Sequence, residues 1–126
     1  MEVGIKNKIE IIVTNDMTAE SMGSGLLPVF GTPYLVALME DTARHSIEND
    51  LEEGLSTVGT KVNVEHVSAT PIGMKVTCES ELIEIDRKRL VFKVEAYDEV
   101  GLVGKGTHER FIIENEKFMG KAQAKL

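Results

Sequence analysis

The chain of 126 residues has the length of one domain, and we expect a single domain over residues 1–126. Hydrophobic residues make up 42% and charged residues 28%, a balance that is typical of folded globular proteins and excludes a disordered chain. The formal net charge of −7 disfavours nonspecific binding to nucleic acid or to an anionic membrane, while a local basic cluster could still bind an anionic coenzyme.

The N-terminal part of the chain predicts a strand followed by a loop. Ile9, Ile11 and Val13 recur at every second position, which is the period of a β-strand with one buried face. The segment from Thr18 to Phe30 is rich in Gly, Ser and Met, and we expect a loop there with room for one helical turn. This loop leads directly to the only long helical signal in the protein.

That helix is expected to begin at Thr32, because threonine followed by Pro33 is typical of an N-cap with proline at the first helical position. It should run from about Pro33 to about Leu51 and end near Gly54. Its first turns, Tyr34 to Met39, are apolar on every side, whereas its last turns keep apolar residues only at a spacing of four. A helix of this kind is buried at its N-terminal end and emerges toward solvent at the other.

Beyond the helix the hydrophobic period changes to two, and four strands are predicted, joined mainly by hairpins at residues 86–88 and 98–101. The residues expected to face the helix are Val58, Thr60, Val62, Val64 and His66, then Met74, Val76, Cys78 and Leu82, then Leu90, Phe92, Val94 and Ala96, followed by a last strand from about Leu102 to Ile113. This order of elements indicates an α+β fold, with one antiparallel sheet and the helix packed on its apolar face. Because one helix covers only part of a five-stranded sheet, we expect a second subunit to cover an exposed edge or flank and form a homodimer.

Two polar residues stand where the pattern favours apolar ones. Glu40 follows the apolar turns of the helix, and His66 ends the inward face of the next strand. A carboxylate that leaves water costs several kcal/mol unless it is paired or hydrogen-bonded. The simplest arrangement is that the helix carrying Glu40 crosses the sheet face carrying His66.

Each candidate also has a purely structural interpretation. Glu40 would mark the point where the helix reaches solvent, His66 would be a satisfied histidine near a strand end, and Thr32 would be only a helix cap. The other two histidines carry weaker signals. His45 lies on the polar half of the helix, and His108 lies in a strand whose irregular alternation suggests a bulge and a structural role.

The spacing of Thr32 and Glu40 limits how a site could be built. They are eight residues apart, so their backbones lie roughly 12 Å apart along a helix that rises about 1.5 Å per residue. Helical side chains lean toward the N-terminus, which shortens this gap without closing it. An extended site along a subunit interface therefore suits the spacing better than a compact triad within one subunit.

Several short motifs occur in one order along the chain: Pro28 to Pro33, Leu38 to Glu40, Val58 to Thr60, Glu65 to Gly73 and Gly106 to Arg110. In this order and spacing they resemble the fluoroacetyl-coenzyme A thioesterase group of hotdog proteins, and the resemblance covers most of the chain, from about Thr14 to Ile113. It implies a hotdog fold, in which an antiparallel sheet wraps around one long central helix. It also implies a homodimer with its sites at the interface.

In that group a threonine, a glutamate and a histidine form the catalytic set, and the resemblance places them at Thr32, Glu40 and His66. The resemblance also implies substrate contacts at Gly59, whose backbone would lie beside the acyl group, and at Phe30 and Arg110.

These residue types fit the hydrolysis of a short- or medium-chain acyl-CoA thioester to free acid and CoA. Glu40 would act as nucleophile or as general base, His66 as acid or base, and Thr32 would orient Glu40 or donate to the carbonyl oxygen. Two alternatives stay open, a non-catalytic acyl-CoA-binding protein and a hotdog dehydratase or hydratase. No metal-ligand spacing, phosphate-binding loop or nucleophile elbow is present, so we expect neither a metal nor a cofactor.

Two features bear on the substrate. The fluoroacetyl-specific members of the group use aromatic residues in the lid region before the helix, whereas here the segment from Ser21 to Val29 has none and only Phe30 is aromatic. We therefore expect a general acyl thioester rather than selectivity for fluoroacetyl. The candidates for binding CoA phosphates are Lys61, Lys75, Arg87, Lys88 and Arg89, although charged turns are more often simply solvated.

The single cysteine, Cys78, excludes an intramolecular disulfide and fits a reducing compartment. It faces the predicted core and is expected to behave as an inert small hydrophobe. The N-terminus lacks the apolar core of a signal peptide, and no apolar stretch approaches the length of about 18 residues that a membrane span needs. We expect a cytoplasmic protein whose partners are an acyl-CoA substrate and a second copy of itself.

Overall fold

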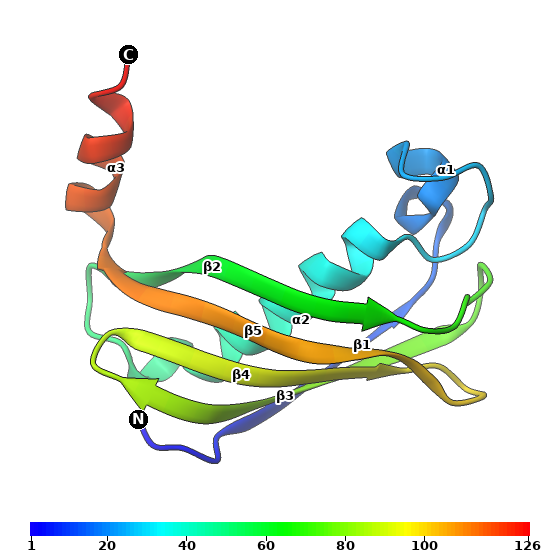
Figure 1. Ribbon diagram of the computed structural model, residues 1–126, viewed down its shortest axis with the longest axis horizontal. Helices are drawn as coiled ribbons and strands as arrows, with labels where there is room; N and C mark the ends of the chain where they lie inside the picture. Colours follow the sequence, from blue (N-terminus) through cyan, green and yellow to red (C-terminus); the bar gives the residue numbers. More distant parts are fainter.

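The computed structural model describes residues 1–126, which form a five-stranded antiparallel sheet with one long helix across one of its faces (Figure 1). The elements are β1 (Lys6–Ile12), α1 (Ala19–Met22), α2 (Thr32–Ser46), β2 (Leu55–His66), β3 (Lys75–Asp86), β4 (Arg89–Tyr97), β5 (Leu102–Glu114) and α3 (Asn115–Gln123), with 3₁₀ turns at Asn15–Met17 and Glu48–Asp50. The strands lie in the order β1-β3-β4-β5-β2. The predicted α+β fold is confirmed.

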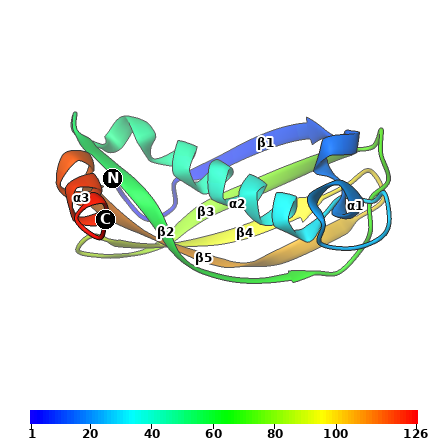
Figure 2. The same ribbon diagram turned by 90° about the horizontal axis from the view of Figure 1, so that it is seen from above.

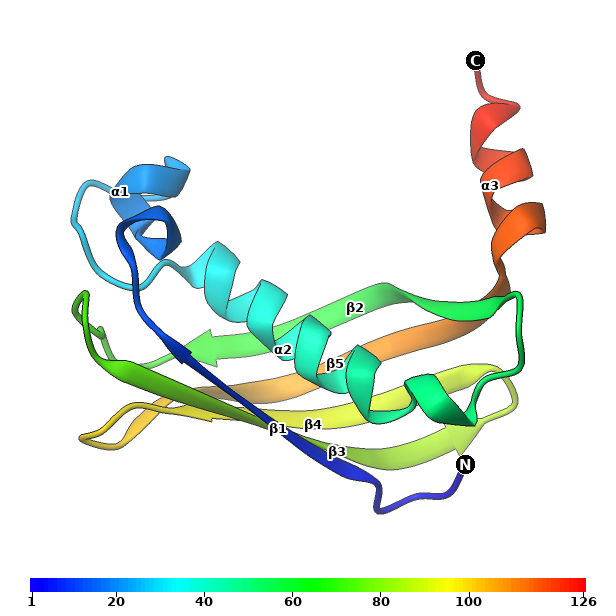
Figure 3. The ribbon, with the colours of Figure 1, turned by 180° about the vertical axis from the view of Figure 1, so that it is seen from behind.

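Helix α2 lies across one face of the sheet in the views from above and from behind (Figures 2 and 3), and the core residues lie between the two. Helix α2 buries side chains that are three, four and eight positions apart, namely Leu35, Leu38, Met39 and Ala43. The sheet meets them with side chains at every second position: Val76, Cys78, Leu82, Leu90, Phe92, Val94 and Ala96. Each large side chain buried in this way contributes roughly 1.5–3 kcal/mol, so α2 is held firmly against the strands.

The ends of α2 differ from the prediction. The helix is capped by Gly31, whose carbonyl accepts from the Leu35 N–H, and Thr32 is the first helical residue. The expectation that Thr32 is the N-cap is therefore wrong, and its hydroxyl is left available for another partner. The helix ends at Ser46 rather than near Leu51, because a 3₁₀ turn takes over at Glu48–Asp50.

A shift of register in β2 changes which of its side chains face the helix. The pairing of β2 with β5 matches Gly59 with Arg110 and Lys61 with Glu109, so Thr60 has no partner. Because paired residues point to the same side of a sheet, one extra residue moves the preceding side chains to the other face. The predicted inward positions are right for Val64 and His66 but wrong for Val58 and Thr60, whose places are taken by Thr57 and Gly59.

The sheet has two hairpins, β3–β4 and β4–β5, as predicted. Strand β2 does not pair with β3 but lies at the edge of the sheet beside β5, so the connection between β2 and β3 spans the sheet. Helix α3, which the sequence analysis did not predict, rises from the end of β5 past the β2 edge and buries none of its residues (Figures 1 and 3). No helix has the length and apolar character needed to cross a membrane.

Candidate functional site

Glu40 lies on α2 over the paired strands β2 and β5. Its Oε2 atom lies 3.6 Å from Nη1 of Arg110 and 4.0 Å from Nε2 of His108. Gly59 lies directly opposite, and a Cβ added to it would be only 2.7 Å from the same carboxylate oxygen. The Glu40 side chain is 39% exposed, whereas Arg110 and His108 are buried. The carboxylate therefore has buried polar groups on one side and an open approach on another.

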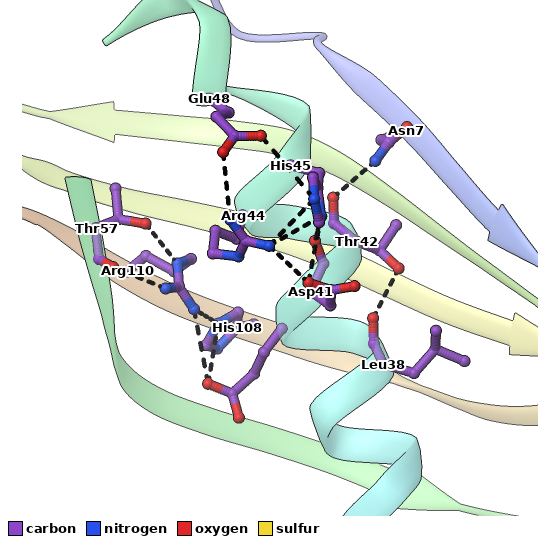
Figure 4. A network of polar contacts seen from close by, with 11 residues as sticks. Asn7, Leu38, Asp41, Thr42, Arg44, His45, Glu48, Thr57, His108 and Arg110 are labelled. Atoms are coloured by element: carbon purple, nitrogen blue, oxygen red, sulfur yellow. Dashed lines mark hydrogen bonds and ion pairs between the residues drawn. The ribbon is translucent and has the colours of Figure 1, made fainter. Parts of the chain in front are cut away.

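Arg110 is held by three hydrogen bonds, two of them to Thr57 of β2 (Figure 4). Its Nε donates to the Thr57 hydroxyl at 2.8 Å, and its Nη2 donates to the Thr57 carbonyl at 2.9 Å. Its Nη1 lies 3.1 Å from Nε2 of His108. Burial lowers the pKa of Arg110, and the nearby Glu40 carboxylate opposes this shift. Three hydrogen bonds thus hold the Arg110 guanidinium beside the partly exposed carboxylate of Glu40.

His108 is neutral in this arrangement, as its hydrogen bonds require. Its Nδ1 lies 2.8 Å from the Lys61 carbonyl, which can only accept, so Nδ1 carries the proton. Its Nε2 is then free to accept from Arg110. Burial lowers the pKa of His108, the Lys61 carbonyl opposes this, and the charge of Arg110 lowers it further. The buried imidazole is therefore both a donor and an acceptor.

A second cluster lies where α2 begins. Oγ1 of Thr32 lies 2.7 Å from Nδ1 of His66, and the buried Nε2 of His66 has no hydrogen-bond partner. Burial lowers the pKa of His66, which the Ser68 backbone partly opposes. Thr32 and His66 border an open hollow of about 320 Å³, whose other lining residues are Ala19, Ser24, Val29, Phe30, Val67, Ser68 and Ala69. The ring of Phe30 meets the His66 ring edge-on, with 6.4 Å between the ring centres.

The residues that the sequence pointed to thus fall into two groups within the chain. Thr32, His66 and Phe30 lie together, while Glu40, Gly59 and Arg110 form the other group. Helix α2 does cross the sheet face that carries His66, as the sequence predicted, but no hydrogen bond or ion pair joins Glu40 to His66 within one chain. The sequence analysis also missed Thr57 and the position of His108 beside Glu40. The two-residue spacing of His108 and Arg110 in β5, which puts both on one face, was the available signal.

Most of the other reactive or charged residues considered in the sequence lie in the core or in surface ion pairs rather than in a functional site. Cys78 is fully buried, which confirms its place in the core, and burial raises its pKa to about 11. His45 is exposed on α2 beside Asp41, as expected. Four of the five cations considered for CoA phosphates pair with carboxylates: Lys61, Lys75, Arg87 and Arg89. These four side chains therefore fit the alternative that the charged residues are simply solvated rather than bound to CoA. Lys88 has no ion pair.

The antiparallel sheet around one long helix, with an acid on the helix facing polar groups of the strands, is the architecture of the hotdog thioesterases. A hot-dog-like protein from Thermanaerovibrio acidaminovorans shares the fold, with a TM-score of 0.92 over 100% of this chain and 93% of its own, at 21% identity.

Residues 13–116 match the fluoroacetyl-CoA-specific thioesterase family. A fluoroacetyl-CoA thioesterase from Streptantibioticus cattleyicolor is 41% identical over 97 residues, which cover 77% of this chain and 70% of that protein. A solved fluoroacetyl-CoA thioesterase structure superposes with a TM-score of 0.96 at 34% identity, covering 100% of this chain and 98% of that chain. Related structures hold fluoroacetate and CoA, or acetyl-CoA. The chain belongs to this family of acyl-CoA thioesterases.

Proposed function

We propose that the protein hydrolyses a short- or medium-chain acyl-CoA thioester to the free acid and CoA. The observation that carries this proposal is the Glu40 carboxylate, which is open to solvent on one side and faces a residue without a side chain, Gly59, on the other. Because Gly59 has no side chain, the Glu40 carboxylate can lie close against β2 with its open side toward an approaching thioester. Arg110 supplies a fixed positive charge beside the reacting acid.

Two routes fit the residues. In the first, Glu40 attacks the thioester carbonyl, the C–S bond breaks to release the CoA thiolate, and water then hydrolyses the resulting enzyme anhydride. In the second, Glu40 takes a proton from a water molecule that attacks the carbonyl directly. In both routes His66 protonates the leaving thiolate or activates water. Thr32 orients the His66 ring through their 2.7 Å contact, and the N–H groups at the start of α2 favour the developing oxyanion.

The acyl group is inferred from the hollow beside Thr32 and His66. Five of its nine lining residues are hydrophobic, with Ala19, Val29 and Ala69 among them, which suits an aliphatic chain. The neighbouring segment before α2 exposes Leu26 and Leu27, at 90% and 65%, and no aromatic side chain. These aliphatic residues support a general acyl substrate rather than selectivity for the fluoroacetyl group on which the named relatives act.

A dimer is part of this proposal, because the two groups of residues lie at separate points of α2. Thr32 is its first residue and Glu40 its ninth, roughly 12 Å apart at the helical rise. The exposed edge strand β2 and the unpaired helix α3 offer a second copy a surface on the same side of the molecule (Figure 1). A second copy there would complete an extended site at the interface.

The buried free thiol of Cys78 supports a reducing compartment such as the cytoplasm.

The test is a thiol-release assay with the purified protein over a panel of acyl-CoA esters from acetyl to decanoyl, fluoroacetyl-CoA included. We expect turnover of several aliphatic esters with no strong preference for fluoroacetyl. Tight binding of one ester without release of CoA would instead identify a non-catalytic binding protein. Hydration of an enoyl-CoA without thioester cleavage would identify a hydratase.

A further inference from the structure

His108 is a buried imidazole that the mechanism above does not use. It is 1% exposed, its ring stacks on Phe92 with 6.5 Å between the ring centres, and both of its nitrogens have partners. Its carbon Cε1 would lie 3.1 Å from a Cβ on Gly59, so it borders the same point of β2 as the Glu40 carboxylate. A buried histidine next to a reacting acid can contact the substrate, or it can fix the positions of the neighbouring side chains.

We propose that His108 is a positioning residue, which accepts a hydrogen bond from Arg110 and so keeps the guanidinium in a long ion pair with Glu40 without a hydrogen bond between them. This inference rests on the proposed role of Glu40 in thioester cleavage. It assigns to His108 no contact with substrate and no transfer of a proton.

The distances from Arg110 to its neighbours support this role of His108. Nη1 of Arg110 lies 3.1 Å from His108 Nε2 but 3.6 Å from Glu40 Oε2. A charge-assisted hydrogen bond between a guanidinium and a carboxylate is usually about 2.7–2.9 Å long, so Arg110 forms a long ion pair with Glu40 but no hydrogen bond to it. The bonds of its Nε and Nη2 to Thr57 fix the rest of the guanidinium plane. His108 is the only hydrogen-bond acceptor that holds the Nη1 end.

Removal of that acceptor has a definite consequence. A buried N–H without a partner is unfavourable, so the flexible carboxylate of Glu40, the nearest remaining acceptor, would move toward Nη1. A short ion pair would then hold the carboxylate, which must be free to attack the carbonyl or to take a proton from water. The carboxylate would be a weaker nucleophile or base, although the fold would be intact.

Two substitutions separate the two hydrogen bonds of His108. In His108→Asn the amide nitrogen can take the place of Nδ1 and still donate to the Lys61 carbonyl, but no acceptor reaches Arg110. In His108→Gln the amide oxygen can take the place of Nε2 and accept from Arg110, while the bond to Lys61 is lost. The pair therefore differs in the one contact that the proposal needs.

We expect kcat of the Asn variant to fall about 10²-fold, with KM changed by less than roughly threefold. The ion-paired carboxylate slows the reaction step but does not change how the substrate binds. The Gln variant should keep most of the wild-type kcat and the shape of its pH profile. Loss of activity in both variants, together with loss of one limb of the pH profile, would show that His108 transfers a proton and would overturn the proposal. Equal kcat in both variants and the wild type would overturn it as well.

A second readout does not depend on turnover. A long-range ¹H–¹⁵N spectrum of the wild-type protein at neutral pH should show Nδ1 of His108 protonated and Nε2 unprotonated. A protonated Nε2 would overturn the positioning role even if the enzyme is active. If the wild type cleaves no thioester, the proposed function fails. The Arg110 side-chain resonances, shifted in the Asn variant but not in the Gln variant, would then still support the contact.

Discussion

Replacement of Gly59 by alanine would place a methyl group in the contact between β2 and the Glu40 carboxylate. The new Cβ would lie 2.7 Å from Glu40 Oε2, 3.1 Å from His108 Cε1 and 3.3 Å from Arg110 Nη1. Ordinary van der Waals contact begins at 3.4 Å, so the carboxylate must move by at least the difference, 0.7 Å. The buried His108 ring and the Arg110 guanidinium must also move, by a few tenths of an ångström.

The effects on stability and on catalysis should differ in size. The atom that must move most is the end of a flexible, 39% exposed side chain, so the fold adapts at little cost. Gly→Ala also restricts the unfolded chain, which stabilises by about 0.4–1 kcal/mol and offsets part of the strain. A misplacement of about 1 Å at a reacting group costs on the order of 10²-fold in rate. We therefore expect kcat/KM to fall about 30- to 100-fold while Tm changes by only about 5 °C or less.

The assay is CoA release by Gly59→Ala and the wild type with the best ester of the panel, beside thermal unfolding of both. Gly101→Ala is the matched control, because a Cβ at Gly101 meets nothing within 4 Å and its backbone is not in the left-handed region. The control should match the wild type in both measurements. An alanine variant at position 59 with wild-type kcat/KM would refute the reasoning that Glu40 must lie where it does.

Three further predictions concern Thr32, Cys78 and the histidines His66 and His108. Thr32→Val removes the hydroxyl that lies 2.7 Å from His66 Nδ1, so kcat/KM should fall about 10- to 100-fold, whereas Thr32→Ser should lose far less; equal rates would contradict a functional role for this contact. Cys78, with its pKa raised to about 11 by burial, should react with a thiol reagent only after unfolding, and rapid labelling of the native protein would contradict its assignment to the core. Burial lowers the pKa of His66 and His108 from the usual 6.5, so below pH 6.5 the unfolded chain binds more protons than the folded one. Stability in urea unfolding should therefore decrease as pH falls from 6.5 through the folded-state pKa values, and a stability that stays level there would be inconsistent with the lowered pKa of these two histidines.

The sequence predicted most of the fold because its signals are local. Strand β3 alternates as far as Leu82, and every inward residue of β4 that the period indicated is buried. Such patterns arise from the backbone geometry of single elements and need no knowledge of their partners. The prediction that α2 is buried on every side at its N-terminal end is wrong, because Ala37 is exposed there while Thr42 and Ala43 are buried further along: the helix buries one face over its whole length.

The errors arose where structure depends on distant residues. The unpaired Thr60 in β2 is set by pairing with β5, and one such residue exchanges the two faces of the strand before it. The contact of His108 with the Lys61 carbonyl joins residues 47 apart in the chain. Helix α3 escaped notice because it buries nothing and therefore carries no strong apolar pattern.

The candidate site was predicted in its members but not in its grouping. Thr32, Glu40 and His66 were selected by type and by resemblance, and Thr32 does contact His66. The companions of Glu40 are fixed by the register between β2 and β5, which brings Gly59 beside Arg110. A period along one strand does not determine that register, so the sequence indicated the acid without its surroundings.

The most direct test of the account is the substitution Glu40→Gln, which keeps the shape of the side chain and removes its charge. Turnover of the best acyl-CoA ester should fall by about 10³-fold or more, since neither nucleophilic attack nor general-base catalysis is then possible. Binding of the same ester, measured by calorimetry, should change by less than about threefold. A glutamine variant that releases CoA at the wild-type rate would contradict the assignment of Glu40 as the reacting group.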